Sequence, residues 1–137
     1  MKKKRARANL FIVGAPKCGT TTLVDWLSQH PQIFSPRIKE PHFYNEDSNH
    51  RIITRESEYL ELYSSVESLE ATYRLDSSVW YLYSPAALNK IEVELREKAK
   101  YIVCLRNPAE MAVSLHQEMF MGDSDNIQHF WEAWHLP

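Results

Sequence analysis

The feature that most constrains this chain is a short apolar run that leads directly into a loop bounded by two glycines. Residues 10–13 are apolar, Gly14 and Gly19 bound the loop, and three threonines follow. Glycines let a backbone approach an anion closely, and the free N–H groups of a helix's first turn point at that anion. The stretch therefore predicts a buried strand, a phosphate-binding loop and the start of a helix.

The position of the loop lysine distinguishes this loop from a standard P-loop. The spacing Gly14-x4-Gly19 matches the P-loop, but Thr20 stands where the P-loop has its lysine, and the loop's own lysine is Lys17. A P-loop phosphotransferase also uses an acidic residue at a strand end to hold magnesium. The strand expected at 101–105 ends in Arg106, which leaves Asp76 as the candidate. A phosphotransferase stays open as an alternative, and no metal is expected.

Three blocks of the sequence, in this order, resemble the sulfotransferases that use 3′-phosphoadenosine 5′-phosphosulfate (PAPS). Pro-Lys-Cys-Gly-Thr-Thr-Thr-Leu at 16–23 is similar to their 5′-phosphosulfate loop. Lys-Glu-Pro-His-Phe-Tyr at 39–44 resembles a segment of the heparan sulfate and related carbohydrate sulfotransferases. The strand ending at Arg106, with Ser114 eight residues later, is similar to the family's 3′-phosphate motif. The resemblance spans nearly the whole chain but only the N-terminal part of the family's domain.

The resemblance implies a site for the sulfo donor. Lys17 would stabilise the negative charge that develops on the departing phosphate. Arg106 and Ser114 would bind the 3′-phosphate, because a guanidinium offers a planar fork of donors. The 5′-phosphate would be bound by the loop and the first helical turn, which comprise Pro16, Lys17, Cys18, Gly19, Thr20, Thr21 and Thr22.

The resemblance also implies residues on the acceptor side. Glu40 and His42 are candidates for the base that removes a proton from the acceptor hydroxyl, because the Glu of this segment has that role in carbohydrate-type members. Lys39 is either a donor to the sulfo group or acceptor, or a solvated loop lysine. Asp76 and Ser77 resemble the stretch that lines the acceptor cleft, although the family has Glu where this chain has Asp76.

The apolar pattern predicts an α/β fold, a P-loop-like parallel sheet flanked by helices. Strands are expected at 10–13, 71–75 and 101–105, and helices at 20–30, 56–63, 84–99 and from Asn107 onward. Leu23, Trp26 and Leu27 are expected to face the sheet. We expect a basic tail at 1–8 and, at 9–137, the N-terminal portion of a sulfotransferase domain that is truncated after the 3′-phosphate helix.

Composition narrows the partners and the location. The basic stretch at the start of the chain is interpreted as a solvated tail rather than a patch for nucleic acid or a membrane surface. No apolar run approaches the ~20 residues that span a bilayer. Cys18 and Cys104 lack paired spacing, so we expect a cytoplasmic protein without disulfides or zinc. The predicted function is transfer of a sulfo group from PAPS to a hydroxyl of a carbohydrate or small molecule. The alternative from another class is a non-catalytic, incomplete nucleotide-binding fragment. The sequence carries no signal for oligomeric state.

Overall fold

The computed structural model describes residues 6–122 and 129–135, and its centre is a parallel sheet of four strands. The strand order is β2-β3-β1-β4, and all three neighbouring pairs run parallel. The strands are β1 (Leu10–Gly14), β2 (Ile33–Phe34), β3 (Tyr73–Asp76) and β4 (Lys100–Val103). The predicted α/β fold with a parallel sheet is therefore confirmed.

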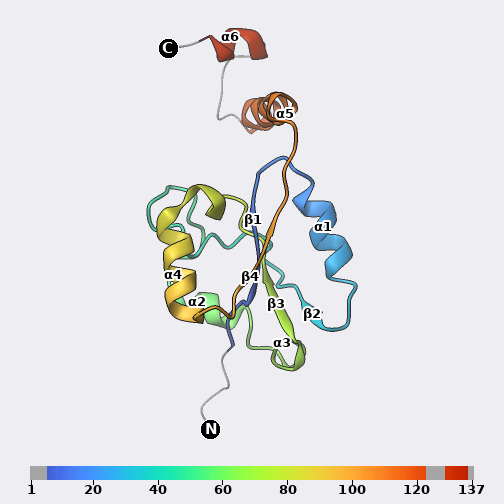
Figure 1. Cartoon of the computed structure of the whole chain (residues 1–137), viewed down its shortest axis with the longest axis vertical. Coiled ribbons are helices and arrows are strands. Elements are labelled where there is room, and N and C mark those ends of the chain that lie inside the picture. The colour runs from blue at the N-terminus through green and yellow to red at the C-terminus, as the bar shows by residue number, and fades with distance from the viewer. Residues whose placement is uncertain (1–5, 123–128, 136–137) are drawn as a thin grey trace.

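Helices cover both faces of this sheet, with α1 and α4 on opposite sides (Figure 1). The helices are α1 (Thr20–Leu27), α2 (Glu56–Glu61), α3 (Val66–Glu70), α4 (Pro85–Leu95), α5 (Pro108–Met121) and α6 (Phe130–Trp134), with a 3₁₀ turn η1 at Tyr81–Tyr83. Side chains of β1 alternate between the two faces, as the pleat of a strand requires. Phe11 and Val13 pack with the α4 residues Ala87 and Ile91, whereas Ile12 packs with Val24 of α1.

The first helix is shorter than predicted and presents a different face to the sheet. It ends at Leu27 rather than at residue 30, and Leu23 and Leu27 pack beside the buried Val24. The expectation for Trp26 is wrong, because its residue is 68% exposed. At about 100° per residue, Trp26 lies about 200° around the helix from Val24 and so faces solvent.

The other predicted elements differ mainly at their ends. The helix expected at 84–99 begins after Ser84, whose hydroxyl accepts a hydrogen bond from the Ala87 N–H, but it stops at Leu95. Arg96 and Glu97 then take positive φ angles of 47° and 65°, a left-handed turn that helices cannot continue through. The strand expected at 71–75 lies at Tyr73–Asp76.

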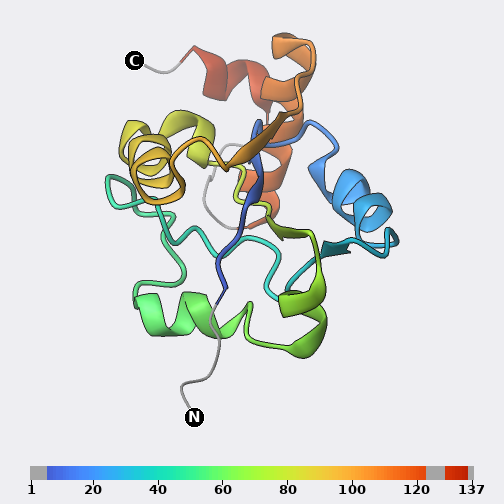
Figure 2. The same ribbon diagram turned by 60° about the horizontal axis from the view of Figure 1, so that its bottom comes forward.

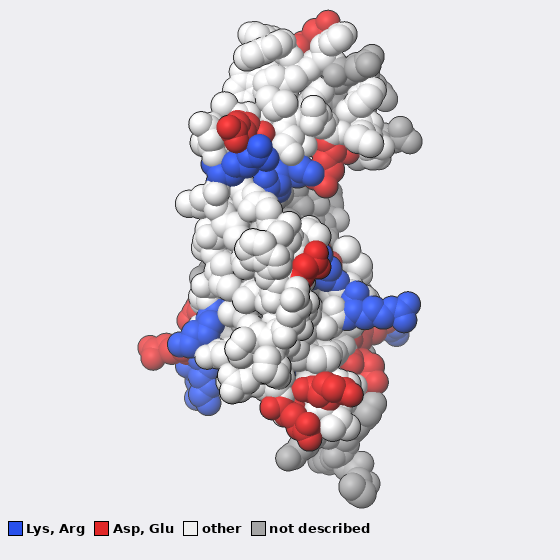
Figure 3. All heavy atoms as spheres, turned by 90° about the vertical axis from the view of Figure 1, so that its right-hand side faces the viewer, with Lys and Arg blue, Asp and Glu red and all other residues white. Residues whose placement is uncertain are grey.

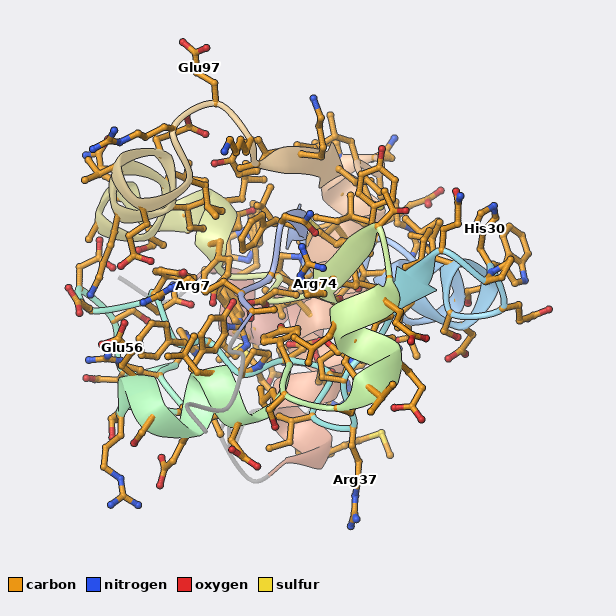
Figure 4. The ribbon with its side chains drawn as sticks, turned by 90° about the horizontal axis from the view of Figure 1, so that it is seen from below. Arg7, His30, Arg37, Glu56, Arg74 and Glu97 are labelled. Carbon is orange, nitrogen blue, oxygen red and sulfur yellow. The ribbon has the colours of Figure 1, made fainter. Side chains whose placement is uncertain are left out.

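The first and last described segments lie at opposite ends of the molecule. Figure 1 places α5 and α6 beyond the end of the sheet that is away from the first described residues, and Figure 2 shows α6 at that same end. At the N-terminal end Ala8 is fully buried, and Arg7 forms ion pairs with Glu56 and, at 2.9 Å, with Glu94. Figure 4 shows Arg7 and Glu56 side by side. The tail boundary predicted after residue 8 stays a prediction, and residues 1–5 lie outside the described part.

Within residues 6–122 and 129–135, none of the helices has both the length and the apolar character needed to cross a bilayer.

Candidate active site

The predicted phosphate-binding loop lies between the carboxyl end of β1 and the start of α1. Lys17 and Gly19 both have positive φ, 61° and 77°, and these two residues turn the loop back over the start of the helix. A Cβ on Gly19 would meet nothing within 4 Å, so glycine serves the backbone conformation there rather than a close approach. Among the described residues no side chain caps α1, so N–H groups of its first turn, at Thr20, Thr21 and Thr22, are available to an anion.

Gly14, at the other end of the loop, is required by packing. A Cβ there would lie 2.8 Å from the Val79 carbonyl oxygen and 2.9 Å from the Leu82 Cβ. The end of β1 therefore lies directly against the segment that follows β3. This contact brings residues 79–80 to the loop and closes one wall of the site.

A pocket of about 450 Å³ opens beside the loop and collects most of the predicted catalytic residues. Seven of its lining residues were predicted from the sequence: Pro16, Lys17, Gly19, Thr20, Thr21, Lys39 and Glu40. Three others were not: Val79, Trp80 and Glu118. The loop with Lys17 and the Lys39–Glu40 pair thus share one cavity, although they come from two separate segments of the chain.

Lys39 and Glu40 connect the loop to the predicted base. The Lys39 ammonium donates to the Thr21 hydroxyl at 2.8 Å and to Glu40 Oε1 at 2.9 Å. The other carboxylate oxygen, Oε2, lies 3.1 Å from His42 Nε2. Burial raises the pKa of Glu40, but the hydrogen bonds and charges of His42 and Lys39 outweigh burial and hold that pKa below its ordinary value. Glu40 is therefore ionised at neutral pH and can accept a proton.

His42 is held in one orientation by a residue that the sequence analysis missed. The Asn45 amide donates through Nδ2 to the Trp80 carbonyl oxygen at 3.3 Å, which turns Asn45 Oδ1 toward His42 Nδ1 at 3.0 Å. Nδ1 then carries a proton, and Nε2 is the nitrogen that faces Glu40. His42 Nε2 and the Glu40 carboxylate therefore lie within hydrogen-bond distance in a fixed arrangement.

A buried network under this segment fixes its backbone. The His42 N–H donates to the Ser78 hydroxyl at 3.0 Å, and that hydroxyl donates to Asp76 Oδ1 at 2.6 Å. The hydroxyls of Tyr59 and Tyr81 donate to Asp76 Oδ2 at 2.8 and 3.0 Å. Burial raises the pKa of Asp76, and the three hydroxyl hydrogen bonds offset part of that rise. Asp76 therefore acts as the anchor of the 42–45 segment.

Asp76 and Ser77, predicted to contact the acceptor, both lie inside the protein and not along the pocket. Asp76 is fully buried, and the Ser77 hydroxyl is buried without a hydrogen-bond partner among the described residues. Their contact with an acceptor stays a prediction. No part of residues 6–122 and 129–135 groups three His, Cys, Asp or Glu side chains as a metal site.

Arg106 and Ser114 both line a second hollow of about 330 Å³. Arg106 lies in the segment between β4 and α5, and Ser114 lies on α5. Arg106 is exposed and its Nε donates to Glu110 Oε2 at 3.0 Å, while its Nη1 lies 3.5 Å from the Lys17 carbonyl oxygen. Asn107 caps the start of α5, where its side-chain Oδ1 accepts a hydrogen bond from the Ala109 N–H. The predicted 3′-phosphate residues thus adjoin the loop.

Cys18 in the loop and Thr22 on α1 are the remaining residues of the predicted donor site. The Cys18 thiol lies 3.4 Å from the Pro16 carbonyl oxygen, and Thr22 is exposed on α1. Figure 3 shows acidic and basic side chains scattered among uncharged ones on the face in view, which carries no broad basic patch.

Known proteins resemble this chain in sequence and in fold. A sulfotransferase of known structure from Alicyclobacillus acidocaldarius matches with a TM-score of 0.80 and 32% identity, over 93% of this chain and 55% of that one. The bifunctional heparan sulfate N-deacetylase/N-sulfotransferase 1 of Xenopus laevis is 31% identical over 119 residues, which is 83% of this chain and 13% of that protein. Human carbohydrate sulfotransferase 15 is 48% identical over 40 residues, or 29% of this chain and 7% of that protein.

The chain thus spans only a small part of these curated relatives and about half of the solved structure. The model of the family described as "Sulfotransferase domain" matches residues 7–135 and so includes the loop, the Glu40 segment and the Arg106–Ser114 pair. The family model thus matches nearly the whole chain. The fold agrees with it, because a parallel sheet carries the phosphate-binding loop, and that loop lines one pocket together with Glu40. This chain belongs to the sulfotransferase family.

Proposed function

We propose that this chain binds PAPS and transfers its sulfo group to a hydroxyl of a carbohydrate or small molecule. The observation that carries the proposal is the shared pocket, in which Lys17 and the start of α1 face Lys39 and Glu40. An anion-binding helix start and an ionised carboxylate are the two groups that such a transfer needs, one for each side of the sulfur.

On the donor side, charge and hydrogen-bond donors are provided by separate groups. The loop and the N–H groups of the first α1 turn would bind the 5′-phosphate, while Arg106 and Ser114 would bind the 3′-phosphate. As the bond between sulfur and the bridging oxygen breaks, negative charge develops on the departing phosphate. Lys17 would stabilise that charge, so the proposed step has its cation without a metal.

On the acceptor side, Glu40 acts as the base. The acceptor oxygen forms a bond to sulfur, its proton passes to the Glu40 carboxylate, and the bridging oxygen leaves with the bisphosphate. His42 lies 3.1 Å behind Glu40 and keeps the carboxylate ionised before the step. Lys39, paired with Glu40 at 2.9 Å, would orient the carboxylate and contact the sulfo group.

The names of the relatives favour a carbohydrate acceptor. One is a carbohydrate sulfotransferase, and another acts on heparan sulfate. The proposed location is the cytoplasm, which is in keeping with the two free thiols at Cys18 and Cys104.

Binding of the nucleotide without transfer is the second candidate. A phosphotransferase is less well supported. Asp76, the acid that would hold magnesium, already accepts hydrogen bonds from three hydroxyls.

The test is transfer of radioactive sulfate from labelled PAPS to a panel of desulfated glycosaminoglycans, simple sugars and phenols. We expect labelled product with the wild-type chain and roughly 10²–10⁴-fold less with Glu40→Gln. Binding of the donor without labelled product would support the second candidate. Equal labelling by the wild type and Glu40→Gln would show that another group is the base.

A further inference from the structure

Glu118 of α5 is a pocket residue for which neither the sequence analysis nor the proposed mechanism provides a role. It lines the same pocket as Lys17 and Glu40, although it comes from a helix that begins after β4. Its Oε1 lies 3.4 Å from the Lys17 Nζ. The lysine that the proposed function assigns to the donor is therefore already paired with a carboxylate.

This pairing matters because of where the lysine lies. Lys17 is in the loop with φ of 61°, and only 27% of its side chain is exposed, so its ammonium reaches the pocket from a fixed backbone. An anionic group of a donor bound at the start of α1 would need the same ammonium. The donor and Glu118 then compete for one cation, and both are negative, so they also repel each other.

Glu118 is the partner better suited to leave. Its side chain is 59% exposed near the C-terminal end of α5, and within the described part of the chain Lys17 is the only ion-pair partner of its carboxylate. Exposed ion pairs are weak and exchange readily with solvent or with a better partner. A phosphate or phosphosulfate brings more negative charge and more acceptor oxygens than one carboxylate.

We infer that Glu118 is a built-in counter-ion for Lys17, and that the donor displaces it on binding. This inference rests on the proposed function, since it uses the same loop and the same lysine. Glu118 then affects both the affinity and the selectivity of donor binding. A ligand can form an ion pair with Lys17 only if it replaces the Glu118 carboxylate, so weakly charged anions bind less well. The released carboxylate stays at the pocket, where it adds negative charge beside Glu40.

The experiment is calorimetric titration with adenosine 3′,5′-bisphosphate of the wild type and four variants: Glu118→Gln, Lys17→Ala, the double variant and Glu97→Gln. Glu97 points away from the body at the far end of the sheet, so its variant controls for net charge alone (Figure 4). We expect Glu118→Gln to bind about three- to tenfold more tightly, as expected from the loss of one competing exposed pair and one like charge. Glu97→Gln should change affinity by less than about twofold, because solvent and salt screen so distant a charge.

The double variant separates exchange at Lys17 from a general charge effect. Most of the gain from Glu118→Gln should vanish in the Lys17→Ala background, because no ammonium is left to release. An unchanged or weaker affinity of Glu118→Gln would overturn the inference, and so would a gain that persists in full without Lys17. If Glu118→Gln instead increases the affinity for magnesium-ATP more than the affinity for the bisphosphate, the role of Glu118 as counter-ion would be upheld. PAPS as the donor would then be overturned. Absence of binding by every variant would overturn both.

Discussion

The two sides of the candidate site are built in different ways. Around Glu40 and His42 the polar groups are largely buried, and each is held by hydrogen bonds to Lys39, Asn45 or Ser78. Around Arg106 and Ser114 the groups are exposed or half-buried, and Arg106 is held by a surface ion pair. Buried networks are costly to disrupt, whereas exposed pairs contribute little to stability. Substitutions on the first side should therefore change chemistry and stability, and those on the second side mainly affinity.

Loss of the base should have the largest effect. Glu40→Gln is expected to lower sulfo transfer by roughly 10²–10⁴-fold, the usual contribution of a general base. It keeps the shape of the side chain, so affinity for adenosine 3′,5′-bisphosphate should stay within about twofold of the wild type. Radiolabel transfer measures the loss of activity, and calorimetry on the same preparation measures the affinity for the bisphosphate. A parallel loss of binding would mean that Glu40 supports the donor site rather than the acceptor.

The anchor beneath the base should come next. Asp76→Ala leaves three buried hydroxyls without their acceptor, and we expect the free energy of unfolding to fall by about 3 kcal/mol or more. Asp76→Asn retains one acceptor oxygen and should lose less. Urea unfolding followed by circular dichroism measures both variants. Equal stability of Asp76→Ala and the wild type would show that the network does not hold the 42–45 segment.

The exposed side should respond in affinity alone. Arg106→Ala is expected to weaken binding of adenosine 3′,5′-bisphosphate by about tenfold, the scale of one charge-assisted hydrogen bond. Binding of AMP, which lacks the 3′-phosphate, should not change, and neither should the urea midpoint. Ser114→Ala is the matched smaller change and should act in the same direction. An equal loss for both nucleotides would place Arg106 at the 5′-phosphate instead.

The smallest effect concerns pH. Because the folded-state pKa of Glu40 is held below its ordinary value of 4.5, the ionised carboxylate stabilises the fold above that pH. This contribution should be lost as the pH falls through the lowered folded pKa. The stability difference between the wild type and Glu40→Gln should therefore shrink on acidification from pH 7 to pH 3. A difference that is constant with pH would mean that the pairing with His42 and Lys39 is absent in solution.

Local features of the fold were predictable from the sequence, and long-range contacts were not. The apolar run before Gly14 and the caps at Ser84 and Asn107 are local signals, and the structure has a strand and helix starts at these places. Asn45 and Glu118 were missed because their partners come from other segments of the chain, and neither residue lies in a motif that marks it. Trp26 was placed wrongly because apolar spacing alone does not say which side of a short helix meets the sheet.

The most direct test of the central claim is calorimetric titration of the wild-type chain with three ligands: adenosine 3′,5′-bisphosphate, AMP, and ATP with magnesium. The account predicts the tightest binding for the bisphosphate, because only this ligand engages the loop at Lys17 and the Arg106–Ser114 pair together. Tighter binding of magnesium-ATP would contradict the account, since it would mean that the pocket serves a phosphoryl donor rather than a sulfo donor.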